Sequence, residues 1–306
     1  MATASGVTAD SARRSFGFAG AATPSELLRD PEIDAVFIAS HHHSHAEYVS
    51  AALRQGKAVF VEKPLATSRA QLESVREAYQ EAGQRGSPFL MAGFNRRFAP
   101  ATAKTREFFA RRQEAMMVHI RINAGFLAPG HWSQQPCEGG RIVGELCHFL
   151  DWSRHLVGSP IRAVTAAALP DGRRYSRDNL AVVLRFADGS IANLVYLSNG
   201  DPSVPKEYFE VFCAGAVARL YDFRALELIR GGKSRKINCA QDKGHRAEML
   251  ATLAALHAGK ESPIPFDELM EVTEASFAVS DAMASATAIE LTSESIANPK
   301  ASFVSA

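Results

Sequence analysis

Three short apolar segments in the first hundred residues constrain the fold more than any other feature. They run from Asp34 to Ser40, from Ala58 to Val61 and from Phe89 to Ala92. Continuous apolar runs of this length are typical of strands that are buried on both faces of a sheet. The stretches between them have the length of helices, so the segments form strand–helix–strand units. Such units build parallel sheets with right-handed crossovers, as in nucleotide-binding domains.

Start and stop signals support the two helices between these segments. The amphipathic stretch from Ala46 to Arg54 is followed by Gly56, a residue type that commonly ends a helix. Ser68 can cap a second helix that runs to about Gly83. Because ligands of open α/β sheets bind beyond the carboxyl ends of the strands, the residues that follow each strand are candidates for a site.

The second half of the chain has a different pattern, in which apolar and polar residues alternate. Strand-like runs cover 117–124, 163–168, 180–186, 191–198 and 208–213, and helices are expected over 101–112, 143–156, 245–258 and 267–290. The alternation predicts an open, mostly antiparallel sheet with one face covered by helices. The uncovered face predicts that the chain associates with itself through this sheet.

The change of pattern lies near Arg97–Ala101 and divides the chain into two expected domains. We expect residues 1–98 to form an incomplete, Rossmann-like dinucleotide-binding domain, and residues 99–306 to form an α+β domain for substrate binding and oligomerisation. A formal charge of +1 gives no electrostatic reason to expect nucleic acid or a membrane as partner. The four cysteines lack CxxC spacing, so we expect reduced thiols in a cytoplasmic protein.

The tripeptide Glu62-Lys63-Pro64 is the first candidate for chemistry, because it follows the second buried strand. A lysine that faces a crevice can lose hydration, which lowers its pKa, and it can stabilise a developing alkoxide. The alternative is a surface ion pair ahead of a turn proline.

His148 is the second candidate, in the run from Gly139 to Trp152. If this run is helical, Glu145, His148 and Asp151 share a face by i, i+3 spacing. Two flanking carboxylates would raise the pKa of the histidine toward or above neutrality and orient its ring. The alternative is a buried helix histidine that is bonded to a carbonyl.

Both candidates lie within a set of four motifs with a characteristic order and spacing. The motifs are Asp34-Ala-Val-Phe-Ile-Ala39 with His45, Gly56 to Leu65, Gly93-Phe-Asn-Arg-Arg-Phe98, and the Gly-Gly to Asp151 block. On these motifs the chain resembles the Gfo/Idh/MocA oxidoreductases, from Val7 to about Glu290. A further set is similar to the subgroup that is fused to zinc-type alcohol dehydrogenase domains and associated with bacterial surface polysaccharide synthesis: Asn95–Pro100, Asn123–Gly125, His131-Trp132, Gly144–Phe149, Pro205-Lys-Glu207, Asp222-Phe-Arg224 and Gln241–His245.

The resemblance implies roles for individual residues. Lys63 and His148 match the catalytic pair of the family, and the nicotinamide of NAD or NADP would lie near Lys63. Cofactor-binding positions would be Ser40, His42, His45, Glu62, Lys63, Asn95 and Arg96. Substrate positions would be Lys63, Arg97, Trp132, Glu145 and His148. For Arg96 and Arg97, a surface role that caps the sheet is the alternative.

Two departures from the family pattern affect these expectations. Many members carry an aspartate four residues before the catalytic histidine, where this chain has Gly144, and Glu145 is the candidate substitute. The family also opens with a strand and a GxGxxG turn that hold the pyrophosphate. No such turn occurs in this sequence, and Gly17 and Gly20 have the wrong spacing. We therefore expect an N-terminally truncated Rossmann-like sheet whose first strand, Asp34–Ser40, exposes an apolar edge.

The expected function is an NAD(P)-dependent oxidoreductase that transfers a hydride between nicotinamide and a hydroxyl-bearing carbon of a sugar, nucleotide sugar or cyclitol. The alternative is a redox-incompetent truncated homologue, which would act as a binding or partner subunit, or a fragment of a longer enzyme. No metal site is expected, because the histidines at 41, 42, 43 and 45 have no cysteine or carboxylate at ligand spacing.

Overall fold

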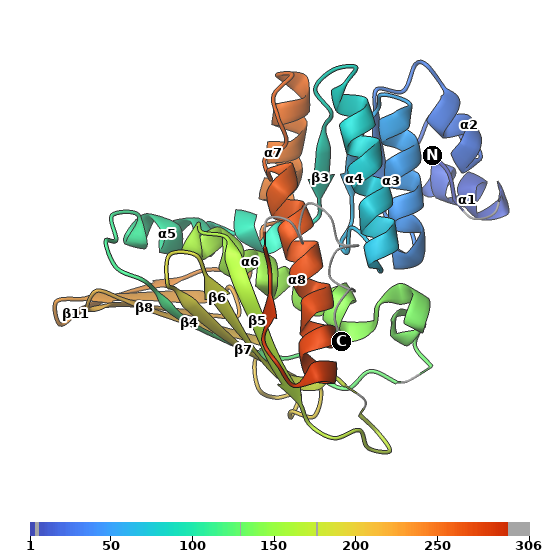
Figure 1. Cartoon of the computed structure of the whole chain (residues 1–306). Helices are drawn as coiled ribbons and strands as arrows, with labels where there is room; N and C mark the ends of the chain where they lie inside the picture. The colour runs from blue at the N-terminus through green and yellow to red at the C-terminus, as the bar shows by residue number, and fades with distance from the viewer. Residues whose placement is uncertain (4–5, 129, 176, 293–306) are drawn as a thin grey trace.

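The computed structural model describes residues 1–3, 6–128, 130–175 and 177–292, which form two separate sheets (Figure 1). The first sheet is parallel, with the order β1 (Ala35–Ile38), β2 (Ala58–Val61) and β3 (Leu90–Ala92). The predicted strands are confirmed, although the first and third are shorter than expected. With the mostly antiparallel second sheet, they make the fold α/β, as expected.

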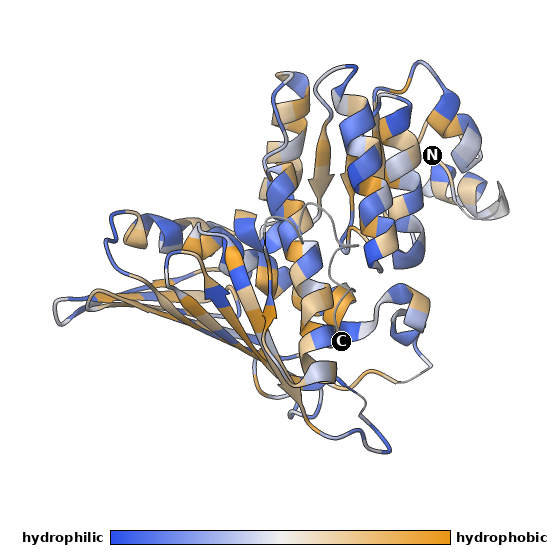
Figure 2. Ribbon diagram, viewed as in Figure 1, coloured by the Kyte–Doolittle hydropathy of each residue, from blue (hydrophilic) through white to orange (hydrophobic). Residues whose placement is uncertain are grey.

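Four helices precede or connect these strands: α1 (Gly6–Phe16), α2 (Pro24–Arg29), α3 (His45–Arg54) and α4 (Arg69–Gly83). The Ser68 hydroxyl accepts a hydrogen bond from the Gln71 amide and begins α4, as the sequence predicts. Helices α3 and α4 pack side by side, with their hydrophilic faces turned outward in Figure 2. These helices cover apolar residues of the small sheet. The residues that follow the strand ends remain available to form a site.

Strand β1 lies at one edge of the small sheet. In the described part of the chain no strand pairs with its outer side. Phe37 on this strand is 46% exposed, and its ring stacks on Phe60 of β2 with 5.4 Å between centroids. The apolar edge that the sequence predicts is therefore present.

The second sheet has nine strands in the order β11-β10-β9-β8-β4-β7-β6-β5-β12. Within this sheet only the described pair β4–β7 is parallel, so the sheet is mostly antiparallel. The bounds are Met117–Asn123 (β4), Ile161–Ala168 (β5), Asn179–Phe186 (β6), Ile191–Leu197 (β7), Glu207–Cys213 (β8), Ala216–Tyr221 (β9), Ala225–Arg230 (β10), Lys233–Asn238 (β11) and Ile289–Glu290 (β12).

Helices cover one face of this sheet, and no helix of the described residues covers the other, which we call the bare face (Figure 1). The covering helices include α5 (Pro100–Phe109), α6 (Cys147–Val157) and α8 (Phe266–Ser285). Helix α8 also packs against α4 and β3, so it joins the two sheets. Among the described residues, no helix is both long and apolar enough to cross a bilayer.

The sequence analysis was incomplete at several elements. It did not predict β9, β10 and β11, which form successive hairpins at one side of the large sheet. The helix expected up to Glu290 ends at Ser285, because Ala286 adopts a left-handed φ of 54°, and Ile289 then pairs with β5. The helix expected from Val143 begins as a π-helical turn (Ile142–Leu146) before α6.

A close backbone contact fixes α7 (His245–His257) against the 3-10 turn η2 (Asn95–Phe98) that follows β3. Gly244 begins α7 with a φ of 91°. A Cβ at Gly244 would lie 2.3 Å from the main-chain oxygen of Asn95, so no larger residue fits there. This contact brings His245 and Asn95 to the same end of the small sheet.

We expect Gly244→Ala to lower the free energy of unfolding by about 2 kcal/mol or more, from the steric overlap and the left-handed φ. Gly83→Ala is the matched control, because a Cβ at Gly83 would meet nothing within 4 Å and its φ is not left-handed. Urea denaturation followed by circular dichroism measures both. Equal stability of the two variants would contradict this account of the contact.

Candidate active site

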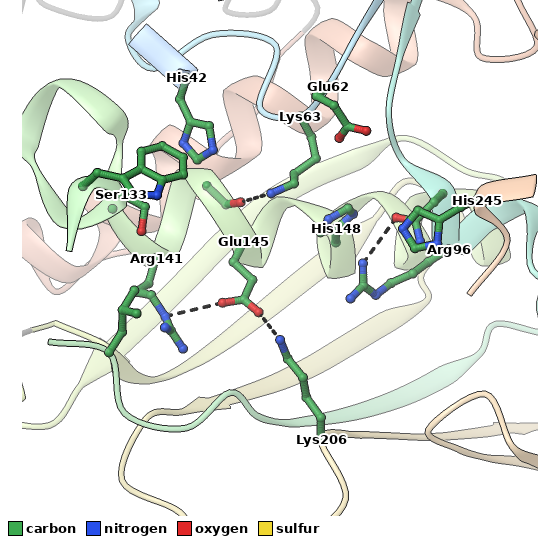
Figure 3. Close-up of a pocket in the computed structure, with 15 residues that line it drawn as sticks. His42, Glu62, Lys63, Arg96, Ser133, Arg141, Glu145, His148, Lys206 and His245 are labelled. Atoms are coloured by element: carbon green, nitrogen blue, oxygen red, sulfur yellow. Dashed lines mark hydrogen bonds and ion pairs between the residues drawn. The ribbon is translucent and has the colours of Figure 1, made fainter. Parts of the chain in front are cut away.

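A cavity of about 360 Å³ lies where the carboxyl ends of the small sheet's strands face the beginning of α6 (Figure 3). Residues after β2 and β3 form one wall, and the π-helical turn with the start of α6 forms another. Its lining residues are His42, Glu62, Lys63, Asn95, Arg96, Leu127, Trp132, Ser133, Gly140, Arg141, Gly144, Glu145, His148, Lys206 and His245.

Lys63 reaches across the cavity from the end of β2. Its Nζ donates a hydrogen bond to the main-chain oxygen of Gly144, 2.8 Å away (Figure 3). A Cβ at Gly144 would lie 2.9 Å from Cε1 of His42, so the glycine makes room for that ring. At the position where many members of the family carry an aspartate, this chain therefore presents a carbonyl oxygen to the lysine.

His148 lines the cavity from the first turn of α6 and is only 7% exposed. Its Nδ1 is buried and has no hydrogen-bond partner among the described residues. Burial lowers the pKa of His148 well below its ordinary value, and the nearby charges of Arg96 and Lys63 lower it further. The ring is therefore a neutral base that can accept a proton.

The expectation that carboxylates raise the pKa of His148 is wrong, because both predicted neighbours are bound to cations. Asp151 is buried and accepts hydrogen bonds from Nε and Nη2 of Arg97. Arg97 also donates to Glu268 at 2.9 Å. Arg97 was expected to contact the substrate, but it does not line the cavity, and its guanidinium binds Asp151 and Glu268.

Glu145 lines the cavity, but its carboxylate is already engaged (Figure 3). Lys206 and the Tyr196 hydroxyl each donate to it, and Arg141 lies 3.4 Å away. Burial by itself would raise the pKa of Glu145, but these three neighbours lower it below its ordinary value. Glu145 is therefore an ionised group that holds two cations at the cavity wall.

Asn95 and Arg96 line the cavity from η2. Both nitrogen atoms Nε and Nη2 of Arg96 donate to Glu207, at 3.0 and 2.8 Å. Glu207 is fully buried and also accepts a hydrogen bond from Lys243. The buried Glu207 carboxylate thus fixes the position of the Arg96 side chain.

Ser40 and His45, two of the expected cofactor-binding residues, do not line this cavity. Ser40 is exposed and its hydroxyl lies 2.7 Å from that of Ser44. His45 is fully buried, with its ring nitrogens 2.8 Å from the Pro64 oxygen and 3.1 Å from the Ser40 oxygen. The ring therefore ties together the segments that follow β1 and β2.

The neighbouring histidines do have a carboxylate partner, which the sequence did not reveal. Glu138 is 3% exposed and accepts hydrogen bonds from the rings of His41 and His43. Burial would raise the pKa of Glu138, but His43 and His41 lower it below its ordinary value. Spacing in the sequence could not indicate this contact, because the carboxylate comes from a distant part of the chain.

Sequence reasoning did not nominate Arg141, Lys206 or His245 as site residues. All three side chains are drawn at the cavity in Figure 3. They lie inside motifs that carry the family resemblance, so their presence in those motifs was the available signal. Their convergence depends on a turn, a loop and a helix start that come from different elements.

Two family models match the chain and together cover more than half of it. Residues 3–90 match an oxidoreductase family with an NAD-binding Rossmann fold, and residues 113–218 match the GFO/IDH/MocA C-terminal domain. The myo-inositol 2-dehydrogenase of Thermotoga maritima is 31% identical over 55% of this chain and 51% of its own length. An inositol 2-dehydrogenase of Paenarthrobacter aurescens is 29% identical over 78% of this chain and 74% of its own. The chain spans about half the length of the first of these relatives.

Solved structures share the fold. An oxidoreductase domain protein from Kribbella flavida superimposes with a TM-score of 0.84 at 20% identity, over 95% of this chain and 89% of the other. Levoglucosan dehydrogenase in complex with NADH and levoglucosan gives a TM-score of 0.82 at 20% identity, with 95% and 89% coverage. The two-sheet arrangement is therefore that of known oxidoreductases.

We expect the His148 ring to stay neutral at pH 6.5 in the folded chain, because burial and neighbouring cations disfavour the imidazolium. Its titration midpoint should lie well below 6.5, whereas in the urea-unfolded chain it should lie near the ordinary value of about 6.5. NMR of chain labelled in histidine, with His148→Asn to assign the signal, measures both. A folded midpoint at or above 6.5 would contradict the structure.

Proposed function

The chain belongs to the Gfo/Idh/MocA family of oxidoreductases, and we propose that it is an NAD(P)-dependent dehydrogenase. It would transfer a hydride between nicotinamide and a hydroxyl-bearing carbon of a sugar, nucleotide sugar or cyclitol. One observation carries this proposal: Lys63 follows strand β2 of the small sheet, His148 lies on helix α6, and both line one cavity. The Lys63–Gly144 hydrogen bond supports a shared role, because Gly144 lies one helical turn before His148.

Oxidation of a secondary alcohol requires a base for the hydroxyl proton and a positive charge for the alkoxide. A bound nicotinamide cofactor supplies the hydride acceptor. We propose that the His148 ring takes the hydroxyl proton, because burial lowers its pKa and leaves the ring unprotonated, with a nitrogen that can accept a proton. The Lys63 ammonium group would stabilise the developing alkoxide and orient the hydroxyl. In the reverse direction His148 would return the proton.

The residues around the cavity fit the nicotinamide end of NAD or NADP. The volume of about 360 Å³ lies within the range of small-molecule sites. Of the residues nominated for the cofactor, His42, Glu62, Lys63, Asn95 and Arg96 line it, and they offer donors and acceptors for an amide and a ribose. In the described part of the chain the elements before β1 are α1 and α2, so no glycine-rich turn for the pyrophosphate is present there.

The substrate end of the cavity supports a hydroxyl-rich molecule. Trp132 is 39% exposed and offers an aromatic surface, while Glu145 with its paired cations Arg141 and Lys206 offers hydrogen-bonding groups. Relatives named inositol dehydrogenase and levoglucosan dehydrogenase act on a cyclitol and an anhydrosugar, which is consistent with this lining. We propose Lys63, Trp132, Glu145 and His148 as substrate contacts.

We also propose a homodimer or homotetramer, formed through the bare face of the large sheet. Exposed apolar side chains on this face include Met117, Phe212 and Tyr221. A cytoplasmic location is proposed because all four cysteines are free thiols and two are exposed, as a reducing compartment maintains them. The division into residues 1–98 and 99–306 is retained as the domain proposal, with α8 joining the two parts.

We expect Lys63→Ala and His148→Ala each to reduce turnover by about 10²- to 10⁴-fold, because each removes a group that acts on the reacting hydroxyl. Lys104→Ala, a change on the exposed face of α5, should leave turnover unchanged. NADH formation from NAD⁺ with myo-inositol or levoglucosan is the measurement, and circular dichroism checks the fold of each variant.

A fluorescence titration with NADH separates the two ways in which this proposal can fail. Loss of activity without loss of NADH binding in the two variants supports the assigned roles. Full activity in either variant removes that residue from the mechanism. A wild-type chain that does not bind NADH would instead support the redox-incompetent homologue.

For the assembly, we expect light scattering at micromolar concentration to give at least twice the chain mass of 33.1 kDa. Phe212→Asp should shift the mass toward the monomer, because it places a charge on the bare sheet face. Leu250→Asp is the control, since Leu250 is 53% exposed on α7, away from this sheet. A monomeric wild-type chain would rule out the proposed assembly.

A further inference from the structure

A second polar cluster lies beside the cavity and has no role in the proposed hydride transfer. We propose that His41, His43 and Glu138 bind a divalent transition-metal ion, with Zn²⁺ the best fit. One ligand atom from each residue lies within 4.8 Å of the other two. The histidines flank the start of the 3-10 turn η1 (His42–Ser44), and Glu138 ends the 3-10 turn η4 (Pro136–Glu138).

Glu138 is held in the position of a ligand. Its Oε1 accepts hydrogen bonds from Nδ1 of His43 at 2.6 Å and of His41 at 3.2 Å. Its Oε2 accepts the main-chain N–H of His43 at 3.3 Å. The residue is 3% exposed, and a buried carboxylate needs charge compensation as well as hydrogen bonds. A divalent cation would provide that charge.

The geometry is close to that of a tetrahedral site. Ligand atoms at about 2.0–2.1 Å from a tetrahedral ion lie about 3.4 Å apart. The distance of 3.2 Å between Nδ1 of His41 and Oε1 of Glu138 is close to this value. The distance of 2.6 Å between Nδ1 of His43 and the same oxygen would have to increase when an ion binds. The side chains of His41 and His43 are 59% and 52% exposed, so a water molecule can take the fourth position.

The set of donor atoms selects the class of metal. Two imidazole nitrogens and one carboxylate oxygen suit Zn²⁺ and related transition metals, whereas Mg²⁺ and Ca²⁺ prefer oxygen atoms throughout. Three protein ligands with one open position is an arrangement that proteins use for Zn²⁺. The site therefore differs in chemistry from the nearby cavity, whose lining has no such group of ligand atoms among the described residues.

A bound ion would fix one wall of the cavity. His42 lies between the two ligand histidines, and its Nδ1 lies 2.9 Å from the main-chain oxygen of Glu138. The ring of Trp132 packs edge-on against His41 and His42, with centroids 4.6 and 4.9 Å apart. An ion at this place would join the end of β1 to the segment that carries Trp132. The fluorescence of the Trp132 indole should therefore change when a metal ion binds.

The test is calorimetric titration of the full chain with ZnCl₂, after treatment with a chelator and without a histidine tag. We expect one equivalent to bind to wild type, and Glu138→Gln and His43→Ala to weaken binding by at least about tenfold. His257→Ala removes an exposed histidine outside the cluster and should bind as wild type does. A chain with Cys137→Ser and Cys239→Ser, which lacks the two exposed thiols, should also bind as wild type does.

A titration with CoCl₂ keeps the proposal testable if a variant folds poorly. In wild type, Co²⁺ should quench the tryptophan fluorescence, because Trp132 contacts a ligand ring, and should give the visible absorption of a four-coordinate ion. Absence of one-equivalent Zn²⁺ binding in wild type would overturn the proposal. So would unchanged affinity in well-folded Glu138→Gln and His43→Ala, or loss of binding when the cysteines are replaced.

Discussion

The buried ion pair between Arg97 and Asp151 holds the helix that carries His148 against the end of β3. Arg97 is 5% exposed and Asp151 is 1% exposed, so water could not solvate either charge if its partner were removed. Removal of one member of such a pair typically costs about 3–5 kcal/mol, because the other is left buried and unpaired. Asp151 lies one helical turn after His148, so the position of the base depends on this contact.

A similar contact fixes the preceding residue of the same turn. Arg96 binds Glu207 at the start of β8, and Lys243 just before α7 shares that carboxylate. Arg96 and Arg97, which follow β3, therefore bind two different elements: Arg96 binds β8 and Arg97 binds α6. The helix that carries His148 is therefore attached to the end of the small sheet by buried charge.

The sequence predicted the elements whose patterns are local. The apolar runs of β1 to β3 and the cap at Ser68 depend on neighbours in the chain, and the structure confirms them. The pairing of charges depends on residues far apart in sequence, and there the predictions failed. Asp151 was expected beside His148, but its partner Arg97 lies 54 positions earlier. Likewise Glu138 lies 95 positions after His43.

The direction of Glu145 depends on a π-helical turn. Helical-wheel reasoning assumes α-helical spacing throughout, whereas the turn from Ile142 to Leu146 has wider i, i+5 spacing. A wheel could therefore not give the contacts of Glu145, which binds Lys206 and Tyr196 and lines the same cavity as His148. The proposed roles of Lys63 and His148 came from the family resemblance, and the structure adds that they share a cavity.

The close approach of Gly144 and His42 constrains how this sequence can change. A Cβ at Gly144 meets the His42 ring at 2.9 Å, so Gly144→Asp in the present background would force that ring out of place. An aspartate at this position, as is common in the family, therefore requires a smaller residue in place of His42 or a displaced His42 ring. The two positions form an epistatic pair, because the residue that fits at one depends on the size and position of the side chain at the other.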